Sequence, residues 1–291
     1  MSTLVQILSP DFLLRDAMLG SVLVGLACPL VGVYFVLRRM IFLGVALPQV
    51  SAAGIAASFL GYRVIAGAHE YLQGGERTLA MIGSFAFTLV ALLVLAAFER
   101  LGRQTVEARI GFTYALAAAA TILFVAYDPH GDALMVNLLK GDILATTGTS
   151  LSVLATVFAG VTLILFLCRK EFLLVSFDRD MAVVFGMRAG AWDVLLYLLI
   201  GVTISLGVMT AGPLVTFGFL VVPPLTARLL TRRMVAFAIV ASLVGGAGAF
   251  AGFYAAYVLD LPLGPAQVVL VSVLFVAVAA ARGVARAVRS A

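Results

Sequence analysis

Charged residues are scarce in this chain of 291 residues, because Asp, Glu, Lys and Arg together make up only 11% of it. Soluble domains carry about 25% charged residues. Hydrophobic residues account for 63% of the chain. This composition excludes an ordinary soluble domain and indicates a protein whose main solvent is lipid.

Other absences narrow the possible functions. The chain contains no GxxxxGK[ST] sequence, so it has no P-loop with which to bind and hydrolyse ATP. Its two histidines, His69 and His130, are not part of an HExxH sequence, so a membrane metallohydrolase is not indicated. Cys28 and Cys168 lie in or beside apolar runs, which predicts a packing role and no disulfide. We expect a transport subunit that is not itself an enzyme and holds no cofactor of its own.

Long apolar runs take up most of the chain. A stretch of about 20 apolar residues is long enough to cross the hydrocarbon layer as a helix. The sequence therefore predicts an all-α polytopic membrane protein, a bundle of about eight or nine transmembrane helices in one permease domain over residues 1–291. Nine candidate spans run roughly over residues 17–37, 41–60, 79–98, 110–127, 151–168, 191–209, 214–230, 235–258 and 265–281.

Basic residues predict how the chain is oriented in the membrane. If the turn at Arg38 and Arg39 faces the cytoplasm, alternation places 15 of the 19 basic residues on that side. Such a bias in short loops is the positive-inside pattern. It predicts an outer N-terminus and a cytoplasmic C-terminus, and it explains the net charge of +5 without nucleic acid. No Asp, Glu, Lys or Arg lies deep in a predicted span, which disfavours a carrier driven by protons or sodium.

Two predicted spans are interrupted. Pro48 and Gln49 stand at the centre of one span, and Gly212, Pro213 and Pro223 break another. Pro and Gly are tolerated in membranes where neighbouring groups or a cavity satisfy the freed backbone groups. Both interruptions are consistent with a transport pathway or with tight helix packing through small residues.

A predicted cytoplasmic loop, about residues 170–190, has the pattern of a short amphipathic helix. Its apolar face recurs at helical spacing, Asp178 and Asp180 stand near its start, and Gly186 is suited to end it. Periodicity alone predicts equally a helix docked on another protein or one lying in the lipid headgroups. The residues of the apolar face are Phe177, Met181, Val184 and Phe185.

Three segments together resemble the permease subunits of bacterial ATP-binding-cassette (ABC) transporters that import zinc, manganese or iron(II). "GVYFVLRRMIFLGVALPQVSAAGIA" is similar to the pattern GxxxVLRRxxLxGDALSHAxLPGIA, and "LLKGDILA" is similar to LFGDILA. The third segment contains "DRDMAVVFGM" and "LVTFGFLVVPPLTARLL", similar to DxxxAxxxGL and LLVxALLVIPAATARLL. The resemblance covers nearly the whole chain and implies a location in the bacterial cytoplasmic membrane.

The resemblance also implies partners. These are a second permease copy or a sister permease, two cytoplasmic ATPase subunits that bind ATP, an extracytoplasmic substrate-binding protein and membrane lipid. It implies that the cytoplasmic loop couples the permease to the ATPase. The implied coupling residues are Phe177, Asp178, Arg179, Met181, Phe185 and Gly186.

One departure from the family pattern concerns the cargo. Members commonly carry Asp and His four residues apart in the first segment, but this chain has Val45 and Gln49 there. Valine offers no lone pair, and a neutral amide cannot compensate the charge of a divalent cation. We hypothesise that Pro48 opens the helix and that Gln49, with Val45, faces the pathway. Alternatively, Gln49 caps the carbonyl freed by Pro48. The cargo is a divalent metal ion, a metal complex or a non-metal substrate, and a passive channel or scaffold is a further alternative.

An outer loop offers a second candidate for metal binding. "YDPHGD" places Asp128, His130 and Asp132 at alternating positions, and oxygen and imidazole ligands suit manganese, zinc or iron. Pro129 and Gly131 are turn residues, so a solvated turn is the alternative interpretation and the one we favour.

Overall fold

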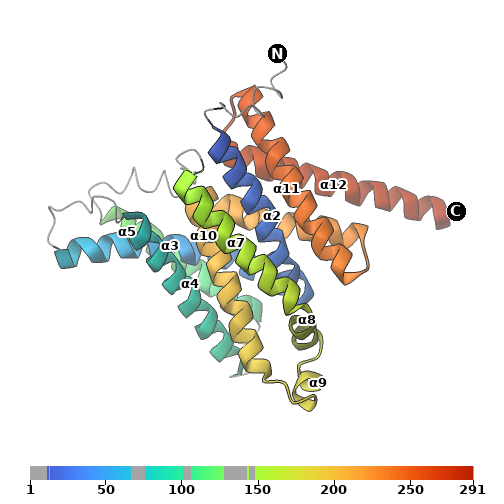
Figure 1. Ribbon diagram of the computed structural model, residues 1–291, viewed down its shortest axis with the longest axis horizontal. Coiled ribbons are helices and arrows are strands. Elements are labelled where there is room, and N and C mark those ends of the chain that lie inside the picture. Colours follow the sequence, from blue (N-terminus) through green and yellow to red (C-terminus); the bar gives the residue numbers. More distant parts are fainter. Residues whose placement is uncertain are drawn as a thin grey trace.

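The computed structural model describes residue 12 and residues 14–66, 76–100, 106–127, 143 and 148–290. Within these residues every long regular element is an α-helix (Figure 1). The elements are α2 (Arg15–Leu37), α3 (Leu43–Ala66), α4 (Glu76–Arg100), α5 (Val106–Ala126), α7 (Gly148–Leu167), α8 (Arg169–Phe177), α9 (Arg179–Val184), α10 (Ala189–Leu230), α11 (Met234–Leu259) and α12 (Leu263–Ser290).

Eight of these helices in the described residues are long and apolar enough to cross a membrane, which confirms the predicted fold class. The nine predicted spans become eight helices because residues 191–209 and 214–230 both belong to α10. α10 is interrupted at Gly212, whose φ of 82° and ψ of 165° are not helical. Positive φ is accessible to glycine because it has no Cβ.

The interruption at Gly212 folds α10 back on itself. A side chain at Gly207 would meet the Thr216 side chain at 3.0 Å. In an unbroken helix, residues nine positions apart are separated by about 13.5 Å along the axis. The two halves of α10 are therefore two packed segments joined by a sharp turn, with Pro213 in the first turn of the second segment, where its missing N–H costs no helical bond.

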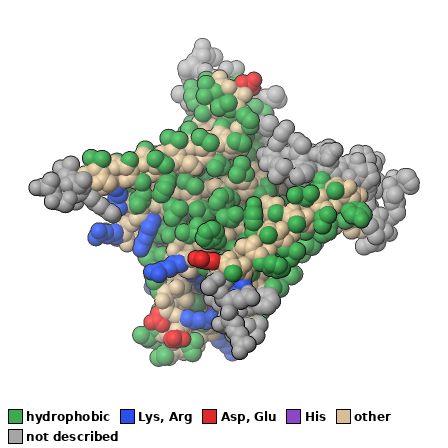
Figure 2. Space-filling model, turned by 180° about the vertical axis from the view of Figure 1, so that it is seen from behind, with side chains coloured by type: hydrophobic (Ala, Val, Ile, Leu, Met, Phe, Trp, Pro, Cys, Tyr) green, Lys and Arg blue, Asp and Glu red, His purple; other side chains and the backbone are tan. Residues whose placement is uncertain are grey.

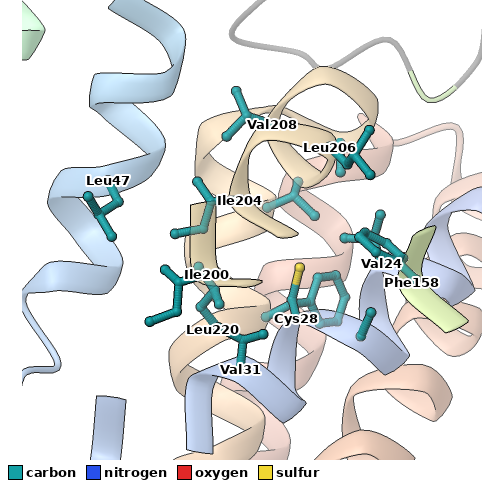
Figure 3. Close-up of a cluster of buried hydrophobic side chains, with 14 of the residues drawn as sticks. Val24, Cys28, Val31, Leu47, Phe158, Ile200, Ile204, Leu206, Val208 and Leu220 are labelled. Atoms are coloured by element: carbon teal, nitrogen blue, oxygen red, sulfur yellow. The ribbon is translucent and has the colours of Figure 1, made fainter. Parts of the chain in front are cut away.

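α2 and α10 form the centre of the bundle (Figure 1). α3, α4 and α5 pack together on one side, and α11 and α12 lie on the other. Buried side chains from α2, α3, α7 and α10 meet between these groups, among them Cys28, Leu47, Phe158 and Ile204 (Figure 3). Hydrophobic side chains also cover most of the described outer surface in Figure 2, as expected where lipid is the solvent.

Glycines allow α2 and α11 to approach closely. A methyl group at Gly25 would lie 2.7 Å from the carbonyl oxygen of Gly245, and one at Gly245 would overlap the carbonyl oxygen of Gly25. Lipid is as apolar as leucine, so transmembrane helices associate through close packing of small residues rather than by the hydrophobic effect. The contact between Gly25 and Gly245 therefore holds α11 against the centre of the bundle.

We expect Gly245→Val to separate α2 from α11 and to lower stability by about 1–3 kcal/mol, the usual cost of overpacking a tight contact. Thermal unfolding of the purified protein in detergent, followed by size-exclusion chromatography, measures the change in Tm. Gly160→Val is the matched control, since no atom lies within 4 Å of a side chain there. Equal Tm values for the two variants would contradict the packing role.

Candidate functional site

A short helical protrusion, made by α8 and α9, lies at the end of the bundle opposite the start of α2 (Figure 1). Asp178 caps α9: its carboxylate accepts a hydrogen bond from the backbone N–H of Met181 at 2.8 Å. The end of α9 is closed by Gly186, with φ of 76°, through hydrogen bonds from Gly186 N–H to Val183 and from Met187 N–H to Ala182. This pair of bonds is the Schellman arrangement. The predictions that Asp178 stands near the start of a helix and that Gly186 ends it are both confirmed.

The predicted apolar face is exposed at the tip of the protrusion. Val184 is 80% exposed, and Phe177, Met181 and Phe185 are also exposed. The prediction of one helix carrying this face is wrong in one respect, because α8 ends at Phe177 and α9 begins at Arg179. Asp178 adopts an extended conformation between them, as a capping residue does. Apolar side chains from both helices together form the exposed tip.

The base of the protrusion packs on α10. Val175 of α8, Ala182 of α9 and Ala189 of α10 are buried together, with Trp192 against them. The Trp192 ring meets the Phe172 ring edge-on at a centroid distance of 5.6 Å, and Phe172 meets Tyr34 of α2 in the same way. The exposed tip is therefore carried on a base that contacts both α2 and α10.

Charged and polar side chains join the protrusion to the bundle. Arg38, which follows α2, forms an ion pair with Asp193 of α10 at 2.8 Å, and its Nε donates a hydrogen bond to Ser176 of α8 at 3.0 Å. Arg179 of α9 lies 3.4 Å from the other carboxylate oxygen of Asp193. The side chains of Arg38 and Asp193 are each 12% exposed, while Arg179 is 49% exposed. Asp193 thus connects α2, α9 and α10.

This ionic cluster was not predicted from the sequence. In the sequence, Arg38 belongs to the positive-inside pattern and to the first family-like segment, and Asp193 is the third residue of an apolar run. The available signal was that Asp193 is an acidic residue within the span predicted for residues 191–209, and ionisable residues in such positions are usually paired.

Pro48 and Gln49 lie in the second turn of α3, which is helical from Leu43 to Ala66. The expected opening of the helix at Pro48 is not observed, so that expectation is wrong. Pro48 is buried, whereas Val45 and Gln49 are partly exposed. Among the described residues Gln49 has no hydrogen-bond partner, so it does not cap the carbonyl freed by Pro48. Its amide is therefore available to another molecule.

The neighbouring face of α3 is small and closely packed. Ser51 is hydrogen-bonded to Ser84 of α4, and Gly54 meets Gly83 of α4 backbone to backbone. Val50 and Ala53 form the α3 wall of a largely apolar cavity of about 880 Å³ between α3, α4 and α5. The structure places Gln49 beside this region, on the half-exposed side of α3.

The second metal candidate, Asp128, His130 and Asp132, lies outside the described residues. Within residues 14–66, 76–100, 106–127 and 148–290, no group of three His, Cys, Asp or Glu side chains is placed to hold a metal ion. The segment "LLKGDILA" also lies almost entirely outside the described part. The roles assigned to these residues stay predictions.

The sequence pattern of the ABC 3 transport family matches residues 11–282. The chain belongs to this family. Manganese transport system membrane protein MntC of Listeria monocytogenes is 26% identical over 262 residues, which cover 90% of this chain and 88% of that protein. Manganese transport system membrane protein MntD of Bacillus subtilis is 26% identical over 268 residues, covering 88% and 87%.

A solved structure has the same fold. PsaBC from Streptococcus pneumoniae, in complex with Fab, superposes with a TM-score of 0.80 at 22% identity, covering 95% of this chain and 94% of that chain. The family membership confirms a non-enzymatic permease subunit, and with the eight spans it confirms a multi-pass protein of the bacterial cytoplasmic membrane.

The Arg38–Asp193 pair is open to a double-mutant test. Removing one partner leaves the other charge poorly solvated, so Arg38→Gln or Asp193→Asn should each lower stability by about 2–4 kcal/mol, and the double variant by less than the sum. Thermal unfolding in detergent measures all three. Arg179→Gln is the control: its half-exposed pair contributes less than about 1 kcal/mol. Strict additivity of the two single substitutions would refute the pairing.

Proposed function

We propose that this chain is the membrane-spanning subunit of an ABC importer for a divalent metal ion, with manganese the first candidate. The observation that carries the proposal is the match, along about nine-tenths of the chain, to membrane proteins of manganese transport systems within one family. The assembly contains this permease with either a second copy of itself or a sister permease. It also contains two cytoplasmic ATPase subunits and an extracytoplasmic substrate-binding protein.

The exposed tip supports the proposed coupling to an ATPase. Large apolar side chains that are exposed on a polar, non-membrane loop are typical of protein-binding surfaces. Here the helix that carries Met181 and Val184 is fixed at both ends by the Asp178 cap and the Gly186 turn. A pre-ordered helix loses little conformational entropy when it docks into a groove. The chain itself lacks a P-loop, so the energy comes from the docked subunit.

Gln49 is the proposed polar contact for the cargo on α3. Its amide oxygen is a hard ligand of the kind that manganese accepts. Val45 contributes no charge, so the neutral amide of Gln49 would bind a metal ion only weakly. The ion could then move past Gln49 with much of its hydration shell intact. A second cargo class, a chelated or neutral compound, is favoured by the same observation, since a charge-neutral complex needs no carboxylate.

Manganese uptake by cells tests cargo and pathway together. A strain lacking the permease, complemented with the wild-type chain, should recover ATP-dependent uptake of radioactive Mn²⁺. Gln49→Leu should lower uptake at least roughly tenfold, since a lost polar contact of about 1.4 kcal/mol in the limiting step has that effect. Expression and Tm should stay at the wild-type level.

The variant Val45→Asp/Gln49→His provides the matched control. It restores the carboxylate and imidazole of the family pattern four residues apart on one helix face, so it should retain Mn²⁺ uptake and bind Mn²⁺ more tightly than wild type. If the wild-type transporter takes up no divalent metal ion, the metal-ion cargo is rejected and the chelated or neutral cargo is left. Full uptake by Gln49→Leu would remove Gln49 from the pathway.

Substituting the exposed tip should separate the permease from its ATPase. Val184→Asp places a charge in the proposed apolar contact and should abolish co-purification of the ATPase subunit and uptake, without lowering Tm. Leu259→Asp is the control, because Leu259 is also an exposed apolar residue but lies at the far end of α11. If Val184→Asp still co-purifies the ATPase with wild-type stoichiometry, the tip is not the docking surface.

A further inference from the structure

Besides the cavity between α3, α4 and α5, a groove lies on the outer surface of the bundle, away from Gln49 and the exposed tip. Its volume is about 320 Å³. α2 forms its floor through Leu30, Val33 and Tyr34, and α7 and α11 form its walls. The wall residues are Thr162, Leu165 and Phe166 on α7, and Met234, Val235, Ala238, Ile239, Ser242 and Leu243 on α11.

The charge of the groove lining lies at one end, at Arg169, while the deeper part is apolar apart from Thr162 and Ser242, whose hydroxyl donates a hydrogen bond to the carbonyl of Leu26. α2 and α7 end, and α11 begins, at the predicted cytoplasmic side, so Tyr34, Phe166 and Met234 lie at its cytoplasmic end. Leu30 lies about one helical turn deeper in the membrane than Tyr34, and Leu243 lies about two and a half turns deeper than Met234. Arg169 of α8 closes the cytoplasmic end, with its guanidinium carbon 5.0 Å from the centre of the Phe166 ring.

More positive charge surrounds this cytoplasmic end. Lys170 follows Arg169, and Arg232 and Arg233 precede Met234, the first residue of α11; these three side chains are exposed. None of the four cations forms an ion pair with a described carboxylate. Glu171 stands next in sequence, but two helical positions turn it away from Arg169, and it does not line the groove. The free cations therefore suit a negatively charged occupant.

The lining of the groove favours a lipid over a helix of another subunit, because basic residues gather at one end of an otherwise largely apolar surface. A phospholipid carries its groups in the same order, with an anionic phosphate at the membrane surface and hydrocarbon below it. Arginine binds phosphate oxygens with two parallel hydrogen bonds.

We propose that this groove binds one anionic phospholipid of the cytoplasmic leaflet, with an acyl chain along α2 between α7 and α11 and its phosphate at Arg169. The lipid would fill the space between two helices that α2 holds apart. It would also contact α8 at the base of the protrusion, because Arg169 and Leu173 both line the groove.

Native mass spectrometry of the full chain in detergent tests the proposal, with phosphatidylglycerol and phosphatidylcholine as probes. We expect phosphatidylglycerol to bind at least roughly fivefold more tightly than phosphatidylcholine, because the attraction of one guanidinium at the membrane surface for an anionic lipid is of this size. Arg169→Gln should remove most of this preference. Ala238→Phe, which fills the groove, should weaken the binding of both lipids.

Two matched controls lie on α12, outside the groove. Arg282→Gln removes a basic residue on the same predicted side, and Ala277→Phe adds a ring to an exposed position. Both should bind lipid as the wild type does. Equal affinities for the two lipids, or wild-type binding by Arg169→Gln, would overturn the proposal. So would an Ala238→Phe protein that keeps its lipid and changes from dimer to monomer, because a second copy would then occupy the groove.

Discussion

The fold depends on the close approach of helix backbones in a solvent that does not drive them together. Lipid chains are as apolar as the side chains they surround, so each helix pair is held by contact area and packing. Gly32 of α2 lies against the backbone of Leu220 of α10, and the Gly25–Gly245 and Gly54–Gly83 contacts do the same for α2 with α11 and α3 with α4. These contacts fix α2 and α10 at the centre, and the functional surfaces are built around them.

A charged cluster within such a bundle has a different physical role from the glycine contacts. The attraction between Arg38 and Asp193 acts where few water molecules screen it, so the pair is sensitive to small changes in distance. Arg38 stands directly between α2 and the turn that leads into α3, and Arg39 beside it has a left-handed backbone conformation with φ of 58°. The ion pair at the base of the protrusion thus lies one short turn away from the start of the helix that carries Gln49.

Local features of the sequence predicted local features of the structure. Apolar runs of about 20 residues gave the spans, since a helix of that length satisfies its own backbone in lipid. Asp178 and Gly186 marked the ends of α9 because their effects act within one turn. The sequence did not predict the continuous helix at Pro48. The helix continues because a proline near its start removes only one hydrogen bond and the packing around it can preserve the helix.

Contacts between distant parts of the chain could not be predicted in this way. The Arg38–Asp193 pair and the groove between α7 and α11 both depend on how helices are placed in space. A pattern of apolar residues predicts which segments enter the membrane, but it does not predict which faces of the helices pack against each other. All helix faces are apolar in such a protein, so periodicity carries less information than it does in a soluble domain.

The uncharged face of α3 has a consequence for how an importer of this kind selects its cargo. A pathway has to bind the cargo firmly enough to admit it and weakly enough to release it. In the proposed pathway, a carboxylate and an imidazole would shift this balance toward binding, whereas Val45 and Gln49 would shift it toward release. In the proposed importer, selection would then take place before the cargo reaches the membrane, on the substrate-binding protein. The permease would in turn contribute a nearly apolar path, and the proposed ATPase at the exposed tip would control its opening.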